Sequence, residues 1–306
     1  MVTACPVGHS PYARRYAVPA TTGWPVSEDG GMPVRVPDDE LPRVFAHGDF
    51  DAADLASAKA GRTVSVCIPA RNEATTIGPI VLSIVSGLTA EGGGIPLVDE
   101  ILVVDDGSTD DTGAIAGRAG ARVIGGETPS GGKGQAMRVA LREAQGDLVA
   151  FIDGDVTNFG PHFVTGLLGP LLTDDTTTVV KGFYQRPLNG APDGGGRVTE
   201  LMARPVIDLL FPALAVIRQP LAGETAAPRW VFEKCVPADG YAVELALLID
   251  AASHFGVETM AQVDLGVRVH RNRPLSELRP QATDILAAAL ARSPLVEPDG
   301  ADRAHG

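Results

Sequence analysis

The sequence predicts an α/β fold in which helices flank an open sheet built mainly of parallel strands. Two short segments, residues 63–69 and 100–105, are almost entirely apolar and rich in β-branched residues, as expected for parallel strands covered on both faces. Helical patterns follow them at residues 76–88 and 109–119. Because strands and helices alternate, right-handed crossovers bring the carboxyl ends of the strands to one edge, where such sheets bind their ligands.

The remaining predicted elements extend this pattern. In the first half of the chain they are a short helix at residues 51–60, a strand at 122–124, a helix at 135–144 and a strand at 148–152. In the less regular second half they are strands at 177–184 and 262–269 and helices at 198–217, 241–255 and 275–290. We expect the helix at 198–217 to be kinked or broken at Pro205 and Pro212, because proline lacks the amide donor of a helix interior.

The composition excludes several classes of protein. The 306 residues are 44% hydrophobic, which excludes a wholly disordered chain, and the net charge of −13 argues against electrostatic binding of nucleic acid. Cys5, Cys67 and Cys235 are too far apart to predict a disulfide framework or a zinc site. Since no segment reaches the roughly 20 apolar residues of a membrane span and no signal peptide is evident, we expect a cytoplasmic protein without a membrane partner.

The strongest single motif is DGD at residues 153–155, directly after the apolar strand at 148–152. Asp153 and Asp155 can present carboxylate oxygens to one hard divalent cation, Mg²⁺ or Mn²⁺. Such a cation would neutralise a departing diphosphate. The alternative interpretation is a plain turn, since Asp-Gly is a common turn dipeptide.

Polar residues also follow the first two strands. ARNE at residues 70–73 begins the helix after the first strand, where main-chain N–H groups and side chains can hold a nucleoside. Asp106, after the second strand, can hydrogen-bond an exocyclic or imide group of a nucleobase. Helix capping, by Ser108 or Asp110 in the second loop, is the alternative interpretation at both places.

Two glycine-rich loops precede predicted helices, and each contains a basic residue. GGKG at residues 131–134 lets the backbone approach a phosphate while Lys133 supplies a cation, although the spacing is not that of a P-loop. GGGRVT at residues 194–199 combines backbone donors, the guanidinium group of Arg197 and the hydroxyl group of Thr199 in a cradle for an anion. A flexible loop is the alternative interpretation of each.

Two further positions suggest a binding role. His270 lies within RVHRNR at residues 268–273, where a neutral imidazole can be a metal ligand and an arginine can hold a diphosphate. A solvated basic turn is the alternative interpretation of this segment. Glu244 stands among residues that otherwise look buried, and a buried glutamate needs a partner.

Taken in order, these motifs resemble those of GT-A-type glycosyltransferases, and more narrowly those of the actinobacterial glucosyl-3-phosphoglycerate synthases. The resemblance runs from about residue 58 to about residue 290. It is carried by SVCIPARNE at 65–73, DGSTDD at 106–111, GKG at 132–134, FYQRPL at 183–188, GGGRVTE at 194–200, QPL at 219–221 and VHRNRPL at 269–275. It implies a GT-A-type, Rossmann-like open mixed sheet flanked by helices, with an acceptor-binding C-terminal half.

The resemblance also implies roles for individual residues. The donor would be bound by Ala70, Asn72, Glu73, Asp106, Lys133, Asp153, Gly154 and Arg268. The metal would be held by Asp155 and His270. The acceptor would be bound by Gly196, Arg197, Val198, Thr199, Asn272 and Tyr184. Catalysis would depend on Asp155, on Glu244 through the sugar hydroxyl groups, and on the backbone carbonyl of Leu221 near the anomeric carbon.

The implied function is transfer of a hexose from UDP- or GDP-glucose to 3-phosphoglycerate by a homodimer that uses Mg²⁺ or Mn²⁺ and retains anomeric configuration. No carboxylate stands out as a nucleophile, which favours attack on the face from which the diphosphate leaves. We expect residues 51–160 to form the nucleotide-sugar-binding half and 161–293 the acceptor-binding half. A partly flexible extension, residues 1–50, would precede them, and a flexible tail, residues 294–306, would follow.

Three departures from the family pattern leave other functions open. The family triplet Asp-Ser-Asp is DGD here, Gln185 replaces an arginine, and Thr225 replaces an aromatic residue. These changes would fit a paralogue of natural-product biosynthesis that uses another nucleotide-sugar and a hydroxyl or thiol acceptor. A catalytically silent protein would bind nucleotide without transfer, and a nucleotidyltransferase of the same fold would release pyrophosphate from a nucleoside triphosphate.

Overall fold

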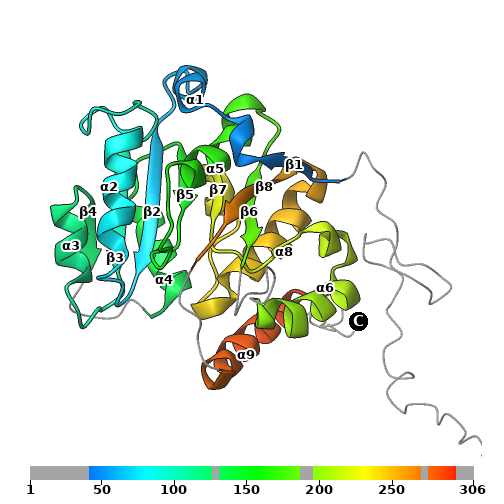
Figure 1. Ribbon diagram of the computed structural model, residues 1–306. Helices are drawn as coiled ribbons and strands as arrows, with labels where there is room; N and C mark the ends of the chain where they lie inside the picture. The colour runs from blue at the N-terminus through cyan, green and yellow to red at the C-terminus, as the bar shows by residue number, and fades with distance from the viewer. Residues whose placement is uncertain (1–40, 126–130, 187–195, 270–274, 294–306) are drawn as a thin grey trace, which may run out of the picture.

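An eight-stranded mixed sheet lies at the centre of the molecule (Figure 1). The computed structural model describes residues 41–125, 131–186, 196–269 and 275–293. Across the sheet the strands are ordered β1-β8-β6-β7-β5-β2-β3-β4. Their bounds are β1 Arg43–Ala46, β2 Val64–Ala70, β3 Glu100–Asp105, β4 Arg122–Gly125, β5 Leu148–Phe151, β6 Val179–Gln185, β7 Thr225–Pro228 and β8 Met260–Val267. The α/β architecture predicted from the sequence is therefore confirmed.

The direction of β7 determines which loops meet at the edge of the sheet. β7 runs antiparallel to both of its neighbours, β5 and β6, whereas the other pairings in the described ranges are parallel. The amino end of β7 therefore lies at the edge where the parallel strands have their carboxyl ends. This edge receives the loops that follow β2, β3, β5, β6 and β8 together with the loop that precedes β7.

The central strand β2 is apolar because it packs against helices on both faces. Its residues Val64, Val66 and Ile68 belong to one core cluster, and Cys67 belongs to the other. Only Pro69 in this strand is not fully buried. Such double coverage is what the almost uninterrupted apolar sequence predicts.

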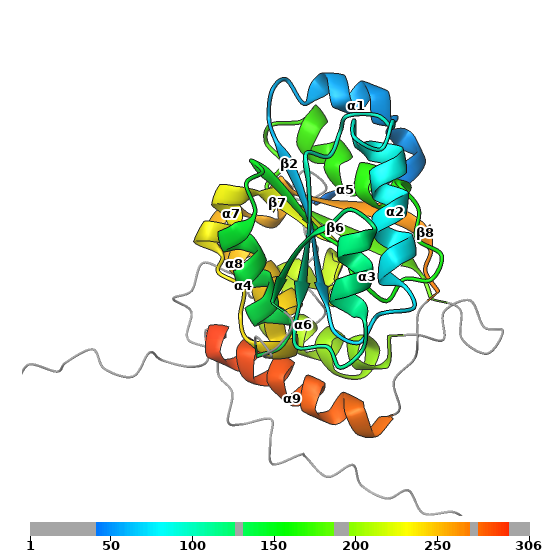
Figure 2. The same cartoon turned by 90° about the vertical axis from the view of Figure 1, so that its left-hand side faces the viewer.

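Helices cover both faces of the sheet (Figure 2). One core cluster includes residues of α1 (Ala52–Ala58), α2 (Ile77–Leu88), α3 (Thr112–Arg118) and α5 (His162–Thr173). The other includes residues of α4 (Lys133–Glu143), α6 (Arg204–Leu210), α7 (Arg229–Lys234), α8 (Val243–Phe255) and α9 (Leu275–Arg292). Figure 2 shows α2 and α3 on one side of the sheet and α4, α7 and α8 on the other. Over the described residues, none of the helices has the length and apolar character that a bilayer crossing requires.

Three elements that the sequence analysis did not predict have short or non-periodic sequences. β1 lies within the range expected to be an N-terminal extension, yet it pairs with β8 and completes one edge of the sheet. β7 has only four residues, TAAP, and lacks the apolar run of a typical buried strand. In α5 every residue from Phe163 to Leu172 is buried, so no polar face marks the helical period.

Next to Pro205, where the sequence predicts a kinked or broken helix, the structure has a local π-helical turn. Within Thr199–Ala203 the backbone widens, the N–H group of Arg204 donates to the carbonyl oxygen of Thr199, and α6 continues. Because proline has no N–H group to donate, this wider turn accommodates it without ending the helix. The break predicted at Pro212 is confirmed, since α6 ends before it and the 3-10 segment Pro212–Val216 follows.

The first turn of α4 packs directly against the backbone that leads into α8. A Cβ atom on Gly134 would lie 1.7 Å from the carbonyl oxygen of Ala238, so no side chain fits there. Glycine at this position lets α4 approach the 3-10 segment Gly240–Ala242. The same approach brings Lys133 of α4 within ion-pair distance of Glu244 of α8.

We predict that Gly134→Ala destabilises the protein by about 1–3 kcal/mol or more, because the added methyl group overlaps a backbone carbonyl. Urea unfolding followed by circular dichroism measures this change. Gly48→Ala is the matched control, since a Cβ atom there meets nothing within 4 Å. Its free energy of unfolding should stay within about 0.5 kcal/mol of wild type. Equal stability of the two variants would contradict the close approach of α4.

Candidate active site

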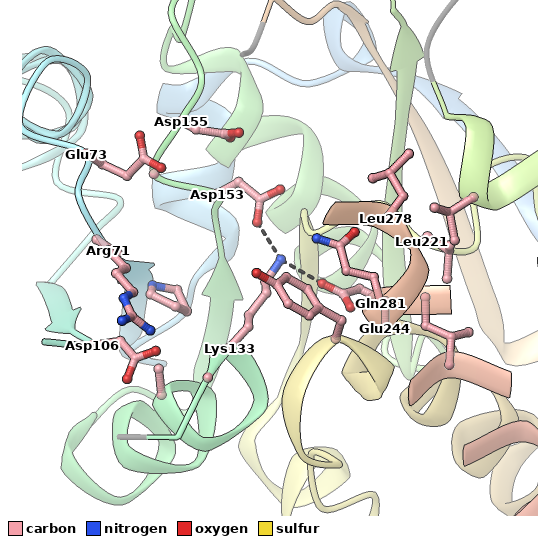
Figure 3. A pocket seen from close by; sticks show the side chains of 18 of the residues that line it. Arg71, Glu73, Asp106, Lys133, Asp153, Asp155, Leu221, Glu244, Leu278 and Gln281 are labelled. Carbon is pink, nitrogen blue, oxygen red and sulfur yellow. Dashed lines mark hydrogen bonds and ion pairs between the residues drawn. The ribbon is translucent and has the colours of Figure 1, made fainter. Parts of the chain in front are cut away.

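A cavity of about 890 Å³ opens at the sheet edge where these loops meet (Figure 3). Its wall contains Ala70, Asn72, Glu73, Asp106, Lys133, Asp153, Gly154, Asp155, Gly196, Arg197, Val198, Thr199, Leu221, Glu244 and Arg268. The predicted convergence of these residues is confirmed, while the role of each stays a prediction. His270 and Asn272 lie outside the described residues. Tyr184 is described but does not line the cavity.

Side-chain hydrogen bonds join the loops after β2 and β3. Asn72 adopts a left-handed conformation with a φ of 57°, and its amide oxygen accepts the N–H group of Thr109 at 2.8 Å. The N–H group of Asn72 donates in turn to the hydroxyl group of Ser108 at 3.0 Å. The N–H group of Glu73 donates to the hydroxyl group of Thr112 at 2.8 Å. The positions that would hold a nucleoside are thus fixed before a ligand binds.

Asp110 accepts hydrogen bonds next to the start of α3, whose N-cap position is Asp111, without a side-chain capping hydrogen bond. Its carboxylate accepts the N–H group of Thr112 at 3.1 Å and that of Ala74 at 3.2 Å. The hydrogen bond from the hydroxyl group of Thr112, more than any other cause, lowers the pKa of Asp110 below its usual value. Because the two N–H groups belong to different segments, Asp110 joins the loop after β2 to the start of α3.

Lys133 bridges two carboxylates in the cavity (Figure 3). Its ammonium group lies 2.6 Å from Oδ1 of Asp153 and 2.6 Å from Oε1 of Glu244. Burial alone would lower the pKa of Lys133, but the two carboxylates raise it well above its usual value. Lys133 therefore stays charged at neutral pH and is the partner that a buried Glu244 requires.

Arg268 joins the two aspartates of the DGD motif. Its Nη2 atom lies 2.9 Å from Oδ2 of Asp153 and 2.6 Å from Oδ1 of Asp155. Burial would raise the pKa of Asp153, yet Lys133 and Arg268 hold it far below its usual value. Asp153 consequently remains ionised between two cations.

The donor chemistry of the DGD motif fits a hard divalent cation. Both carboxylates converge on one positive group, the guanidinium of Arg268, which shows that their oxygens can share a cation. Carboxylate oxygens suit Mg²⁺ and Mn²⁺. Among the described residues no three or more His, Cys, Asp or Glu side chains gather as a metal cluster. The other predicted ligand, His270, lies outside these residues.

Beneath the cavity, Glu224 and Tyr184 support Arg268. Glu224 is 0% exposed and lies 3.3 Å from Nη1 of Arg268, and complete burial raises the pKa of this carboxyl group. The hydroxyl group of Tyr184 donates to Glu224 at 2.9 Å and accepts from Arg186 at 2.8 Å. Tyr184 is buried below the wall and its hydroxyl group is already hydrogen-bonded, so the acceptor contact predicted for it stays a prediction.

The turn that carries Leu221 is held in place by contacts with Tyr184 and with Asp153. The side-chain amide of Gln219 accepts from the N–H group of Tyr184 at 3.3 Å and donates to its carbonyl oxygen at 2.5 Å. Gly223 lies so close to the DGD motif that a Cβ atom there would be 2.1 Å from Oδ1 of Asp153. These contacts hold the backbone of Leu221 at the cavity wall.

Several cavity residues carried no predicted role. Three of them, Arg71, Arg186 and Tyr241, stand inside or beside the motifs of the resemblance, and three more, Leu278, Gln281 and Ile285, come from α9. The spacing of the second group by three and then four residues places them on one helix face. This helical spacing could have been recognised in the sequence. It does not, however, distinguish residues that line a cavity from residues that pack in the core.

Comparison with known proteins agrees with this geometry. The model of the family described as glycosyl transferase family 2 matches residues 65–211. The glucosyl-3-phosphoglycerate synthase of Mycolicibacterium smegmatis is 48% identical over 253 residues, which are 79% of this chain and 82% of that protein. A crystal structure of the Mycobacterium tuberculosis synthase with Mn²⁺, UDP-glucose and phosphoglyceric acid gives a TM-score of 0.73 at 42% identity, covering 85% of this chain and 90% of that one. Another, with Mg²⁺ and UDP, gives 0.74 at 42% identity, covering 84% and 88%.

The mixed sheet, its flanking helices and the DGD motif at the cavity define a GT-A-type glycosyltransferase. More narrowly, the chain belongs to the glucosyl-3-phosphoglycerate synthase family. The resemblance based on sequence motifs is therefore confirmed at the level of family, fold and enzyme class.

Lys181 is a buried lysine beneath the turn that carries Leu221. Its ammonium group donates to the carbonyl oxygen of Ala222 and, at 2.9 Å, to the hydroxyl group of Thr225. Burial lowers the pKa of Lys181 to about 8. Between about pH 8 and the usual value of 10.5, this side chain therefore binds fewer protons when folded than when unfolded.

This difference predicts that the contribution of Lys181 to stability rises with pH. The unfolding free energy of wild type minus that of Lys181→Met should increase by on the order of 1–3 kcal/mol between about pH 7 and about pH 10. Chemical denaturation at each pH provides the measurement. Lys234→Met, at an exposed position, should show no such trend. A difference that does not change with pH at position 181 would show that the buried amine keeps its ordinary pKa.

Proposed function

We propose that this glycosyltransferase transfers glucose from UDP-glucose to 3-phosphoglycerate with Mn²⁺ or Mg²⁺ as cofactor. The observation that carries the proposal is that the DGD motif, Lys133 and the glycine-led segment 196–199 line one cavity. The similar M. tuberculosis enzyme has been solved with UDP-glucose, phosphoglyceric acid and either cation in its structures. The match covers 90% of that enzyme's chain, which supports the proposal.

The donor would bind on the side of the cavity formed by β2, β3 and β5. Asn72 and Glu73, whose loop is hydrogen-bonded to the next one, would hold the nucleoside together with Asp106. Lys133 would place its charge beside the diphosphate. Asp155, with His270, would hold the divalent cation, which neutralises the departing diphosphate when bound.

The acceptor would bind at the start of the helix after β6. Gly196 has a φ of 84° and leads into Arg197 and Thr199 on the cavity wall. Backbone N–H groups at a helix start, a guanidinium group and a hydroxyl group form a cradle for a phosphate or carboxylate. This arrangement suits an acceptor with a terminal phosphate.

We further propose that transfer retains the anomeric configuration. Asp153 and Glu244 are already paired with Lys133, so neither is poised as a nucleophile in the described structure. A departing diphosphate oxygen would accept the proton of the acceptor hydroxyl group while that hydroxyl oxygen attacks the same face of the sugar. The carbonyl of Leu221 would stabilise the developing positive charge, and Glu244 would orient the sugar hydroxyl groups.

The departures at Gln185 and Thr225 do not favour a different acceptor. Thr225 is buried and holds Lys181 below the cavity. Gln185 is exposed at the end of β6 and does not line the cavity. Neither residue contacts the space in which an acceptor would lie, so we retain the phosphoglycerate proposal.

The state of assembly is also a proposal. We infer a homodimer, supported by Leu286 and Leu290 of α9, which are 38% and 43% exposed while Ile285 and Ala289 of the same helix pack on the core. The cytoplasmic location stays a prediction from the sequence.

We predict that Asp155→Ala lowers glucosyl transfer by at least about 100-fold, because the metal loses a carboxylate ligand. Mass spectrometry of the product with Mn²⁺ measures transfer. Asp175→Ala, which removes an exposed carboxylate, should leave transfer unchanged. Undiminished transfer by Asp155→Ala, or by wild type in excess chelator, would contradict the metal-dependent mechanism.

We predict that Arg197→Gln raises the KM for 3-phosphoglycerate about 10- to 100-fold, because a charged hydrogen bond to the acceptor is lost. The KM for UDP-glucose should change little. Arg118→Gln on the exposed surface of α3 is the matched control. If wild type transfers glucose only to acceptors without an anionic group, the phosphoglycerate proposal fails.

A further inference from the structure

A second cavity, of about 420 Å³, adjoins the segment proposed to bind the acceptor. Arg186 and Thr199 line both this cavity and the main one, so the two spaces share a wall. The remainder of the second cavity includes Glu200, Arg204 and Arg218. The proposed catalytic and binding roles use neither Arg204 nor Arg218.

The second cavity carries an excess of positive charge. Three guanidinium groups line it, against the single carboxylate of Glu200. Arg204 lies 3.1 Å from this carboxylate, whose side chain is 60% exposed and therefore weakens the local positive charge only partly. Within the described residues no carboxylate comes within ion-pair distance of Arg186 or Arg218. Because the chain as a whole has a net charge of −13, a local cluster of three arginines indicates a site for an anionic ligand.

Aromatic rings of β6 hold two of these arginines in place. The guanidinium group of Arg186 lies 4.9 Å from the ring centre of Tyr184, and that of Arg218 lies 4.6 Å from the ring centre of Phe183. Arg204 donates from Nη2 to the carbonyl oxygen of Arg218 at 2.5 Å. The three side chains are thus arranged before any ligand binds, which lowers the entropic cost of binding.

Arg186 has an unsatisfied donor. Its Nη2 atom donates to Tyr184, but its Nε atom is buried and has no hydrogen-bond partner in the described structure. Buried donors in folded proteins are nearly always satisfied by protein, water or a ligand. Because this Nε atom is closed to both cavities, the contribution of Arg186 to an anion site rests on the place of its side chain in the wall that the two cavities share.

We propose that the second cavity binds an anionic group, a phosphate or a carboxylate, in addition to the one held at residues 196–199. Guanidinium groups bind such oxygens through paired, charge-assisted hydrogen bonds. The bound anionic group can have two sources. It is either the second anionic group of an acceptor that carries two, or a separate small anion. The existence of this anion site does not depend on the proposed function, but its assignment to the acceptor rests on that function.

Calorimetric titration with inorganic phosphate at constant ionic strength tests the site directly in the full chain. In an Arg197→Gln background, which weakens the first anion site, residual phosphate binding should remain. Adding Arg218→Gln should weaken this binding at least about tenfold, because a charged hydrogen-bond donor is lost. Arg118→Gln in the same background should leave it unchanged. No residual binding in the background, or equal binding with and without Arg218→Gln, would overturn the proposal.

Kinetics then distinguish the two sources. If the anion belongs to the acceptor, Arg218→Gln raises the KM for 3-phosphoglycerate but leaves inhibition by glycerol 3-phosphate, which carries one anionic group, unaltered. If the anion is a separate ligand, added phosphate changes the rate of wild type at saturating acceptor and does not change that of Arg218→Gln. Phosphate binding without any glucosyl transfer would support the second site and contradict the proposed function.

Discussion

The active-site edge depends on the mutual neutralisation of partly buried charges. Lys133 holds Asp153 and Glu244, and Arg268 holds Asp153 and Asp155, so Asp153 is shared by two cations. These side chains come from α4, α8 and the loops after β5 and β8. Removing either member of such a pair leaves an uncompensated charge in a poorly solvated place. The ion pairs therefore fix both the electrostatics of the cavity and the relative positions of four elements.

Close backbone approaches make these ion pairs possible. Gly134 lets α4 contact the backbone at Ala238, and Gly223 lets the turn after Gln219 lie against Asp153. Below this layer, Lys181 and Glu224 form hydrogen bonds and an ion pair that hold the loop before β7 and Arg268. The cavity wall is thus supported by buried polar contacts rather than by apolar packing alone. Such support limits the motion of the groups that would bind donor and acceptor.

Sequence reasoning predicted the first half of the fold well because each strand there is a short apolar run followed by a polar loop. The carboxyl ends of parallel strands must share an edge, so the convergence of Asp106 and Asp153 followed from topology alone. β7 and α5 gave no such signal, because one is four residues long and the other is buried all round. The place of Tyr184 also depended on tertiary structure, since its sequence does not show that Glu224 and Arg268 would surround its hydroxyl group.

The two sides of the cavity come from different stretches of the chain. The loops proposed to hold the nucleoside belong to a parallel βα unit within 64–118, whereas Leu221 and the proposed acceptor segment 196–199 lie between β6 and β7. Substitutions in this later stretch leave the pairing of β2 with β3 untouched. Because Gly223 and Glu224 of the same stretch contact Asp153 and Arg268, a chimera that exchanges the proposed acceptor segment has to keep these two residues.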